Sequence, residues 1–183
     1  MLGTVNCFQG VEANYVAYYC AIPLIAPATS WSGRAYLNMP AARLLQTGSS
    51  FPTIVDMGAE IIHTDNVNVG PGTLVVFTSV SGTTKEAIAA LEYAKKKGAR
   101  ILTLTGTKDA PLERLADVNF FNSCADPTSS ENFYLQTLLI ALSIMHHVDK
   151  YPEYDRVVSE LQRLPSLLVD VKERFEDRAS SFA

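Results

Sequence analysis

Short apolar runs alternate with helix-patterned segments along most of the chain. Runs rich in Val, Ile, Phe and Thr are typical of strands, and TLVVFTS is apolar enough to be buried on both faces of a sheet. Strand, helix, strand at this spacing indicates right-handed crossovers and a parallel sheet covered on both faces, hence an α/β fold. The pattern predicts strands at 52–56, 73–79, 100–106 and 118–122, and helices at 36–45, 83–97, 111–116 and 131–148.

The two longest predicted helices differ in how much of their surface is apolar. Residues 83–97 carry apolar side chains on one side and lysines on the other, and Gly98 is placed to end the helix. Residues 131–148 are apolar nearly all round. That second helix is therefore expected to be buried in the core or in a subunit interface.

The two ends of the chain differ in pattern from its middle. The prolines in residues 1–31 break both the helix and the strand patterns, and we interpret this segment as an irregular or partner-dependent arm. Residues 151–183 predict a charged extension of two amphipathic helices interrupted at Pro165. The expected organisation is therefore an arm (1–31), an α/β domain (32–150) and a helical extension (151–183).

Composition narrows the class of protein. A length of 183 residues suits one domain with an extension, and a net charge of −4 with a pI near 5.3 argues against a nucleic-acid partner. Cys7, Cys20 and Cys124 are widely separated, as reduced thiols of a cytoplasmic protein would be, and have no metal-ligand spacing. The apolar stretch 16–28 contains two prolines and lacks a basic leader, so neither a signal peptide nor a membrane anchor is expected.

The turn between the strand 73–79 and the helix 83–97 is unusually rich in hydroxyl groups. A helix that starts there directs its free N–H groups and positive dipole end at the turn, and Gly82 would allow an anion to approach the backbone closely. The alternative is an ordinary helix N-cap, which needs only one Ser or Thr. Four hydroxyls favour a phosphate site, formed by Ser79, Val80, Ser81, Gly82, Thr83 and Thr84.

Neither a nucleotide P-loop nor a dinucleotide-binding glycine pattern is present. The stretch SVSGTTKEAIAALEYAKKKGARILTLTG instead resembles the phosphosugar-binding motif of the SIS (sugar isomerase) domain family, S-x-S-G-x-T-x-[DE] followed by a helix, K-x-x-G-A and a strand. The resemblance extends over about residues 30 to 183. It implies a three-layer α/β/α, flavodoxin-like fold with a five-stranded parallel sheet. It also implies that Ser79, Val80, Ser81 and Thr84 hold the phosphate of a sugar.

The family has an earlier glycine-rich turn, whose counterpart here is Ser32–Tyr36, with Gly33 and Arg34 as candidate phosphate contacts. Ala35 stands where relatives often have a phosphate-contacting serine. Arg34 could replace that contact with a charge, or it could be an ordinary surface arginine. The tail resembles the linker that leads from a first to a second SIS domain in glucosamine-6-phosphate synthase and in fructosamine 6-phosphate deglycases.

Moving a proton between neighbouring carbons of a sugar phosphate needs a carboxylate or an imidazole close to the anchored sugar. Glu131 opens the helix 131–148 and is one candidate, although a first-turn glutamate is also favoured by the helix dipole. His63, with Glu60 one turn before it, falls where the resemblance places a short helix near the ligand. His147 is a third candidate, but its adjacency to His146 also suits a structural or interface role.

These observations predict a phosphosugar-binding SIS protein, either a sugar-phosphate isomerase or a ketoamine-phosphate deglycase. The alternative is a non-catalytic sensor of sugar phosphates; residues 1–31 contain no Lys or Arg, so DNA binding by this chain alone is not expected. The resemblance implies a homodimer, to which the apolar helix 131–148 could contribute. We expect no cofactor, no metal and no membrane partner, and a cytoplasmic location.

Overall fold

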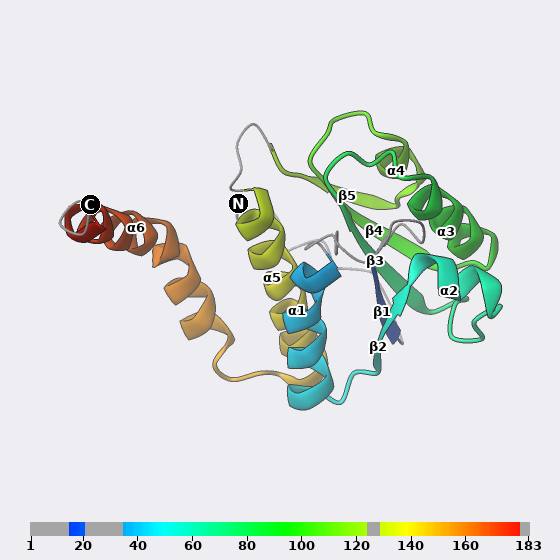
Figure 1. The fold of residues 1–183 in the computed structure, drawn as a ribbon. Coiled ribbons are helices and arrows are strands. Elements are labelled where there is room, and N and C mark those ends of the chain that lie inside the picture. Colours follow the sequence, from blue (N-terminus) through cyan, green and yellow to red (C-terminus); the bar gives the residue numbers. More distant parts are fainter. Residues whose placement is uncertain (1–14, 21–34, 124–128, 180–183) are drawn as a thin grey trace. The chain divides into compact units, whose positions relative to one another are not determined.

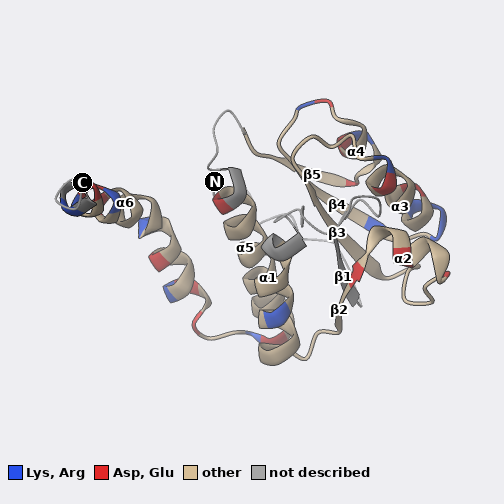
Figure 2. Cartoon of the chain, in the orientation of Figure 1, with Lys and Arg blue, Asp and Glu red and all other residues tan. Residues whose placement is uncertain are grey.

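The computed structural model describes residues 15–20, 35–123 and 129–179. The chain forms two compact units, Met1–Lys150 and Tyr151–Ala183. Figure 1 shows that the first unit holds the whole sheet. Acidic and basic residues lie mostly on the helices and loops, and few are on the strands (Figure 2). No helix in the described ranges is long and apolar enough to cross a membrane.

The described strands form one sheet in which every neighbouring pair is parallel. Their order is β2-β1-β3-β4-β5. β3 is buried along its whole length and pairs with β4 so that Val76 lies opposite Leu102. The predicted α/β fold with a parallel sheet is therefore confirmed. The strands are β1 (Tyr15–Cys20), β2 (Thr53–Met57), β3 (Thr73–Ser79), β4 (Arg100–Thr105) and β5 (Val118–Phe121).

The expectation that residues 1–31 form an irregular arm is wrong for Tyr15–Cys20. This segment is β1, and it lies between β2 and β3 with parallel pairing on both sides. Its sequence, YVAYYC, is rich in aromatic and β-branched residues, which favour strands. The prolines that suggested irregular structure come only after the strand ends, so the strand was hidden in a longer apolar stretch.

The helices of the first unit cover the sheet in two groups (Figure 1). α1 and α5 contact each other, and α1 also contacts β1 and β2. On the other side α3 contacts α2, α4 and β4. Because the strands are parallel, the turns that lead from strands into helices lie together at the carboxyl edge of the sheet. The helices are α1 (Ala35–Gly48), α2 (Gly58–His63), α3 (Lys85–Lys96), α4 (Pro111–Leu115) and α5 (Ser129–Asp149).

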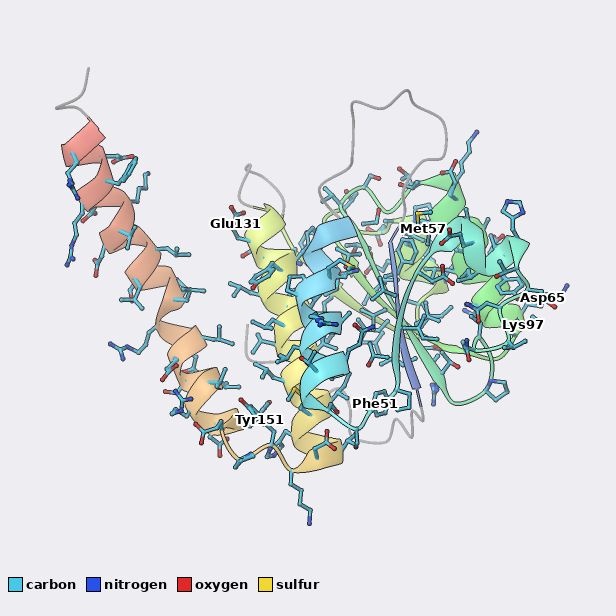
Figure 3. The ribbon with its side chains drawn as sticks, turned by 60° about the horizontal axis from the view of Figure 1, so that its bottom comes forward. Phe51, Met57, Asp65, Lys97, Glu131 and Tyr151 are labelled. Carbon is cyan, nitrogen blue, oxygen red and sulfur yellow. The ribbon has the colours of Figure 1, made fainter. Side chains whose placement is uncertain are left out.

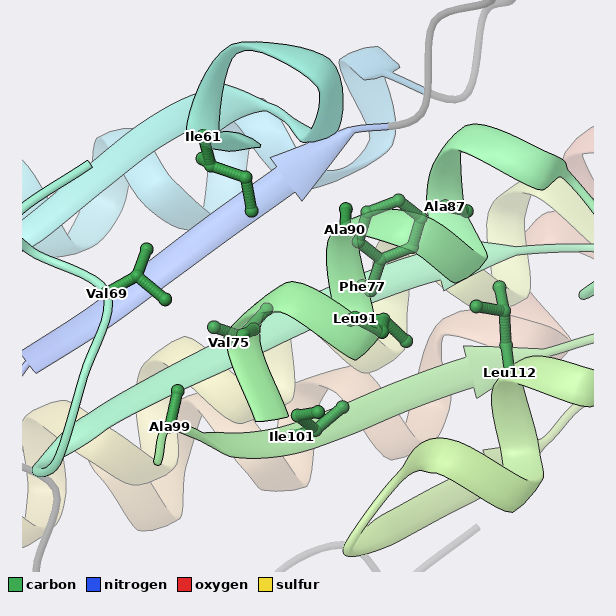
Figure 4. Close-up of a cluster of buried hydrophobic side chains, with 11 residues drawn as sticks. Ile61, Val69, Val75, Phe77, Ala87, Ala90, Leu91, Ala99, Ile101 and Leu112 are labelled. Atoms are coloured by element: carbon green, nitrogen blue, oxygen red, sulfur yellow. The ribbon is translucent and has the colours of Figure 1, made fainter. Parts of the chain in front are cut away.

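A cluster of buried apolar side chains joins β3 and β4 to the face of α3 (Figure 4). Small alanines on α3 bring the helix close to the sheet, and Phe77 and Leu91 fill the space between them. Each fully buried Leu or Phe contributes about 1.5–3 kcal/mol of hydrophobic stabilisation. The cluster fixes where α3 begins, and with it the turn that precedes α3. Its members are Ile61, Val69, Val75, Phe77, Ala87, Ala90, Leu91, Ala94, Ala99, Ile101 and Leu112.

The second unit corrects another expectation. Residues 151–183 were predicted to form two helices broken at Pro165, but α6 (Tyr154–Ala179) runs through that proline as one helix. A proline inside a helix costs about 3 kcal/mol or more, because it removes one backbone hydrogen bond and crowds the preceding turn. The strong amphipathic pattern on both sides of Pro165 favours one continuous helix despite that cost.

Candidate functional site

The turn between β3 and α3 is held in shape by its own hydroxyl groups. The Ser79 side chain is buried at the end of β3, and its Oγ accepts a hydrogen bond of 3.1 Å from the Gly82 backbone N–H. The Ser81 Oγ accepts a longer one, 3.4 Å, from the Thr83 N–H. These local bonds hold the backbone of the turn at the carboxyl end of β3.

Gly82 occupies a position that other residues would strain. Its φ is +62°, in the left-handed region, and a Cβ built on it would lie 2.5 Å from the Ala110 Cβ. The Leu112 N–H also donates to the Gly82 carbonyl at 3.2 Å, which ties the turn to the start of α4. The glycine is therefore required both by backbone conformation and by close packing.

The hydroxyl groups of Thr83 and Thr84 do not cap the N-terminus of α3. Thr84 is the N-cap residue of α3 and its side chain makes no capping hydrogen bond. Within the described residues, the hydroxyls of Thr83 and Thr84 have no hydrogen-bond partner. The first N–H groups of α3 also lack acceptors within the helix, and its dipole places partial positive charge there. The turn therefore combines free hydroxyls with a helix N-terminus, the combination that binds phosphate in many proteins.

The loop after β4 lies against this turn, and sequence reasoning missed its contribution. The Gly106 N–H and the Thr107 Oγ1 both donate to the Val80 carbonyl, at 3.0 and 3.1 Å. The next residue, Lys108, holds its ammonium 5.1 Å from the centre of the Phe121 ring at the end of β5. A cation thus stands on the loop that borders the turn. The signal available in the sequence was its place just after a strand, because carboxyl ends of parallel strands share an edge.

The end of β5 is tied to α5 by a reciprocal amide pair. The Asn122 Nδ2 donates to the Gln136 Oε1 at 2.5 Å, and the Gln136 Nε2 donates back to the Asn122 Oδ1 at 2.7 Å. The Asn122 N–H also donates to the Thr105 carbonyl at the end of β4. This pair anchors the N-terminal half of α5, which carries Glu131, to the carboxyl ends of two strands.

The three predicted catalytic residues are not brought together within one chain. Glu131 is exposed in the first turn of α5 (Figure 3). His147 is exposed 16 residues later in the same helix, about 24 Å away along its axis. His63 is exposed at the C-terminal end of α2. Glu131 and His147 therefore cannot act on one substrate in the same subunit. The other two predicted phosphate contacts, Gly33 and Arg34, lie outside the described residues.

A carboxylate pair lies at the carboxyl end of β2, and its Asp56 was not predicted. The Asp56 carboxylate accepts hydrogen bonds from the Met57 N–H and the Asn66 Nδ2, both at 2.9 Å. A hydrogen bond with Asp56 raises the pKa of the neighbouring Glu60. Glu60 is fully exposed, so solvent weakens this effect.

Elsewhere Asp65 and Lys97 form an ion pair of 2.6 Å (Figure 3). No three metal-ligating side chains gather in the described part of the chain.

The sequence as a whole also matches a known protein family. The sequence pattern described as "SIS domain" matches residues 39–146, more than half of the chain. The chain belongs to the SIS domain family. The predicted resemblance to this family is therefore confirmed. The motif on which that prediction rested lies in the turn Ser79–Thr84 of this SIS domain.

Curated relatives are much longer than this SIS domain chain. It is 28% identical over 148 residues to a glutamine–fructose-6-phosphate aminotransferase (isomerizing) of Thermus thermophilus, covering 76% of this chain and 24% of that protein. It is also 29% identical over 107 residues to an HTH-type transcriptional regulator of Caldanaerobacter subterraneus, covering 57% of this chain and 38% of the regulator. The chain therefore spans about a quarter of the first relative's length.

Solved structures share the fold at low identity. A Bacillus subtilis protein described as a phosphosugar isomerase superimposes with a TM-score of 0.78 at 19% identity, over 98% of this chain and 53% of that one. The Vibrio vulnificus NanR protein, complexed with ManNAc-6P, superimposes with a TM-score of 0.59 at 20% identity, over 88% of this chain and 59% of that one. These neighbours establish the α/β SIS fold.

Proposed function

We propose that this chain binds a phosphorylated sugar, with the phosphate held by the turn Ser79–Thr84. The observation that carries the proposal is that the Thr83 and Thr84 hydroxyls are free in the described structure while they surround a helix N-terminus. Hydroxyls and backbone N–H groups can hold an anion without a large positive field, which suits a chain of net charge −4. The ManNAc-6P complex of NanR supports the same ligand class.

We propose further that the protein interconverts aldose and ketose phosphates or cleaves a ketoamine phosphate. Both reactions need a base that moves a proton between adjacent sugar carbons. Glu131 is the preferred base, because the Asn122–Gln136 pair anchors its helix beside the carboxyl ends of β4 and β5. His63 is a second candidate on the element that follows β2. His147 could serve only a site to which another subunit contributes.

A non-catalytic sensor is the second candidate function. One observation favours it: the predicted catalytic residues are exposed and dispersed, whereas the phosphate turn is well formed. The similarity to an HTH-type transcriptional regulator supports this reading as well. As a sensor, the chain would bind sugar phosphate through the same turn and transmit binding to a protein partner.

Two measurements on the same preparation separate these functions. We expect fructose 6-phosphate, glucosamine 6-phosphate or fructosamine 6-phosphate to raise the melting temperature, and at least one of them to be turned over. The variant Glu131→Gln should retain the thermal shift and lose the turnover, because it removes the base and keeps the shape. Stabilisation without any turnover would favour the sensor. No stabilisation by any of the three would overturn the binding proposal itself.

The assembly and setting are proposals of the same kind. The family resemblance suggests a homodimer, a complete five-stranded sheet of the flavodoxin-like type and a cytoplasmic location, with no nucleic acid and no membrane partner for this chain. Much of α5 is already buried within one subunit, including Phe133, Ile140 and Ala141. A dimer contact through α5 would therefore use its remaining exposed positions, such as Tyr134 and Val148.

A further inference from the structure

α6 exposes a row of large apolar side chains along one face. Leu168, Val171 and Phe175 are 51%, 61% and 70% exposed. The same row continues toward the N-terminus of the helix with half-buried residues, namely Val157, Leu161 and Leu164. Single exposed apolar residues are common on protein surfaces, but a continuous row of this kind marks a contact surface.

The spacing of the row specifies what kind of surface could cover it. Its six residues follow one another at intervals of 4, 3, 4, 3 and 4, which is a seven-residue repeat. An average of 3.5 residues matches a helix that winds around another helix in a left-handed supercoil. Two further apolar residues, Val158 and Leu167, flank the row on the helix surface. The seven-residue spacing of the row itself indicates that the partner is a helix.

The charges on α6 argue against a lipid surface and leave a protein partner. The helix carries six acidic and five basic residues, which alternate along its length (Figure 2). Helices that bind anionic membranes have an excess of Lys and Arg on their polar face. The helix also accommodates Pro165 in its interior, so its stability must come from packing of the apolar row rather than from helix propensity.

We propose that α6 pairs in an antiparallel manner with α6 of a second copy of this chain. One register places every apolar position of the row opposite another. Leu164 then faces the partner's Leu168, Leu161 faces the partner's Val171, and Val157 faces the partner's Phe175. The two-fold axis passes beside Ser166, so each of these layers occurs twice.

The charges that flank the row select this orientation. In the antiparallel register Glu160 lies beside the partner's Arg174, again twice by symmetry, which is the position of stabilising ion pairs in helix pairs. A parallel pair in register would place Glu160 beside the partner's Pro165 and Arg174 beside the partner's Ala179, with no ion pair. Glu160 already contacts Arg156 within its own helix at 2.8 Å, so the added pair would extend an existing network.

The native mass of the full chain, measured by light scattering across a concentration series, tests the pairing. Val171→Asp should halve the mass, because it buries a carboxylate in an apolar layer. The matched control is Val169→Asp, which makes the same change at an exposed position, 54% accessible, outside the row. Circular dichroism of each variant confirms that the helices are retained.

A charge exchange tests the orientation independently. Glu160→Arg and Arg174→Glu should each raise the dissociation constant by about threefold to tenfold, and the double variant E160R/R174E should restore it. A wild-type chain that stays monomeric, or a mass that Val171→Asp leaves unchanged, would overturn the proposal. Failure of the double variant to recover would overturn the antiparallel register, and with it the pairing as proposed. The test involves no sugar phosphate, so it is independent of the proposed function.

Discussion

Two serine-rich turns of this protein use the same chemistry with different outcomes. At the end of α1, Ser49 and Ser50 surround the Asp149 carboxylate: the Ser49 Oγ donates to Oδ2, the Ser50 Oγ donates to Oδ1 at 2.5 Å, and the Ser50 N–H donates to Oδ2 at 3.2 Å. At the end of β3, the turn Ser79–Thr84 presents a similar set of donors. In the described structure no carboxylate of the chain fills that second set.

The difference lies in the helix ends that the two turns adjoin. Asp149 is at the C-terminal end of α5, where the dipole disfavours negative charge, so hydroxyl donors must hold it. The turn Ser79–Thr84 precedes the N-terminal end of α3, where the dipole favours an anion. Serine-rich turns can thus bind an anion at either end of a helix. We call Ser49–Ser50 the closed turn, because the Asp149 carboxylate occupies its donors, and Ser79–Thr84 the open turn. The open turn is the one whose helix dipole favours an anion. This comparison is the physical basis for treating Ser79–Thr84 as the ligand site.

Removing donors from the open turn should have the largest effect. In Ser81→Ala/Thr84→Ala, two hydrogen bonds to a charged phosphate would be lost, each contributing about 1.5–3 kcal/mol. We expect affinity for a hexose phosphate to fall on the order of 100-fold or more, measured by calorimetry. The matched control removes the closed pair, Ser49→Ala/Ser50→Ala, and should leave that affinity unchanged. Equal affinities in both double variants would contradict the comparison.

Changing the backbone of the open turn comes next. Gly82→Ala places a Cβ at φ +62° and 2.5 Å from the Ala110 Cβ. The left-handed conformation and the methyl contact together should destabilise the fold by about 2–3 kcal/mol and distort the phosphate donors. Denaturant unfolding measures the loss of stability. Gly70→Ala is a suitable control, since its Cβ would meet only the Lys97 carbonyl at an ordinary distance of 3.8 Å. A Gly82→Ala variant as stable as Gly70→Ala would refute this account of the turn.

Local patterns predicted the turn well, because all of its parts are consecutive in the sequence. Strand β3, the hydroxyls and the amphipathic face of α3 each leave a direct signal. What surrounds the turn could not be predicted in this way. Thr107 reaches it only because β4 pairs with β3, and Asn122 meets Gln136 only because the N-terminal half of α5 returns to the segment that follows β5. Contacts of this kind depend on strand order, which a single sequence does not fix.

Two errors have a common cause. The sequence-based prediction did not include β1 and divided α6 into two helices, because it gave proline more weight than the residues around it. In β1 the prolines follow the strand, and in α6 the seven-residue apolar repeat continues through Pro165. In both cases packing of apolar side chains outweighs a local backbone preference. The catalytic candidates differ from these two cases: Glu131 and His147 lie in the helix that the sequence predicts, but at its opposite ends.

The hydroxyls of Thr103 and Thr105 form a third set, and they test whether hydroxyls already bonded within the chain contribute to stability alone. The Oγ1 atoms of the buried Thr103 and Thr105 both donate to the Asn119 Oδ1, at 2.8 and 3.1 Å. Asn119→Ala should leave two buried hydroxyls without their acceptor and lower the free energy of unfolding by about 1–2 kcal/mol. Sugar-phosphate affinity should stay within error of the wild type when both are measured below the unfolding transition. A large loss of affinity without loss of stability would instead place Asn119 in the ligand site.

The smallest expected effect is the pH dependence of the closed turn. Hydrogen bonds from Ser49 and Ser50 lower the pKa of the Asp149 carboxyl below its usual value. A lowered pKa in the folded state means that the bonds stabilise the protein above the unfolded pKa of about 3.9, and that this contribution is lost as pH falls through the folded pKa. Asp149→Asn should therefore be slightly less stable than the wild type near neutral pH, with the two converging in acid. Because Asp149 is exposed, the difference should be modest, and melting curves from pH 7 down to pH 3 would measure it. A difference that stays constant over that range would mean that Ser49 and Ser50 bind Asp149 through geometry alone. The charge argument that separates the two turns would then lose its support.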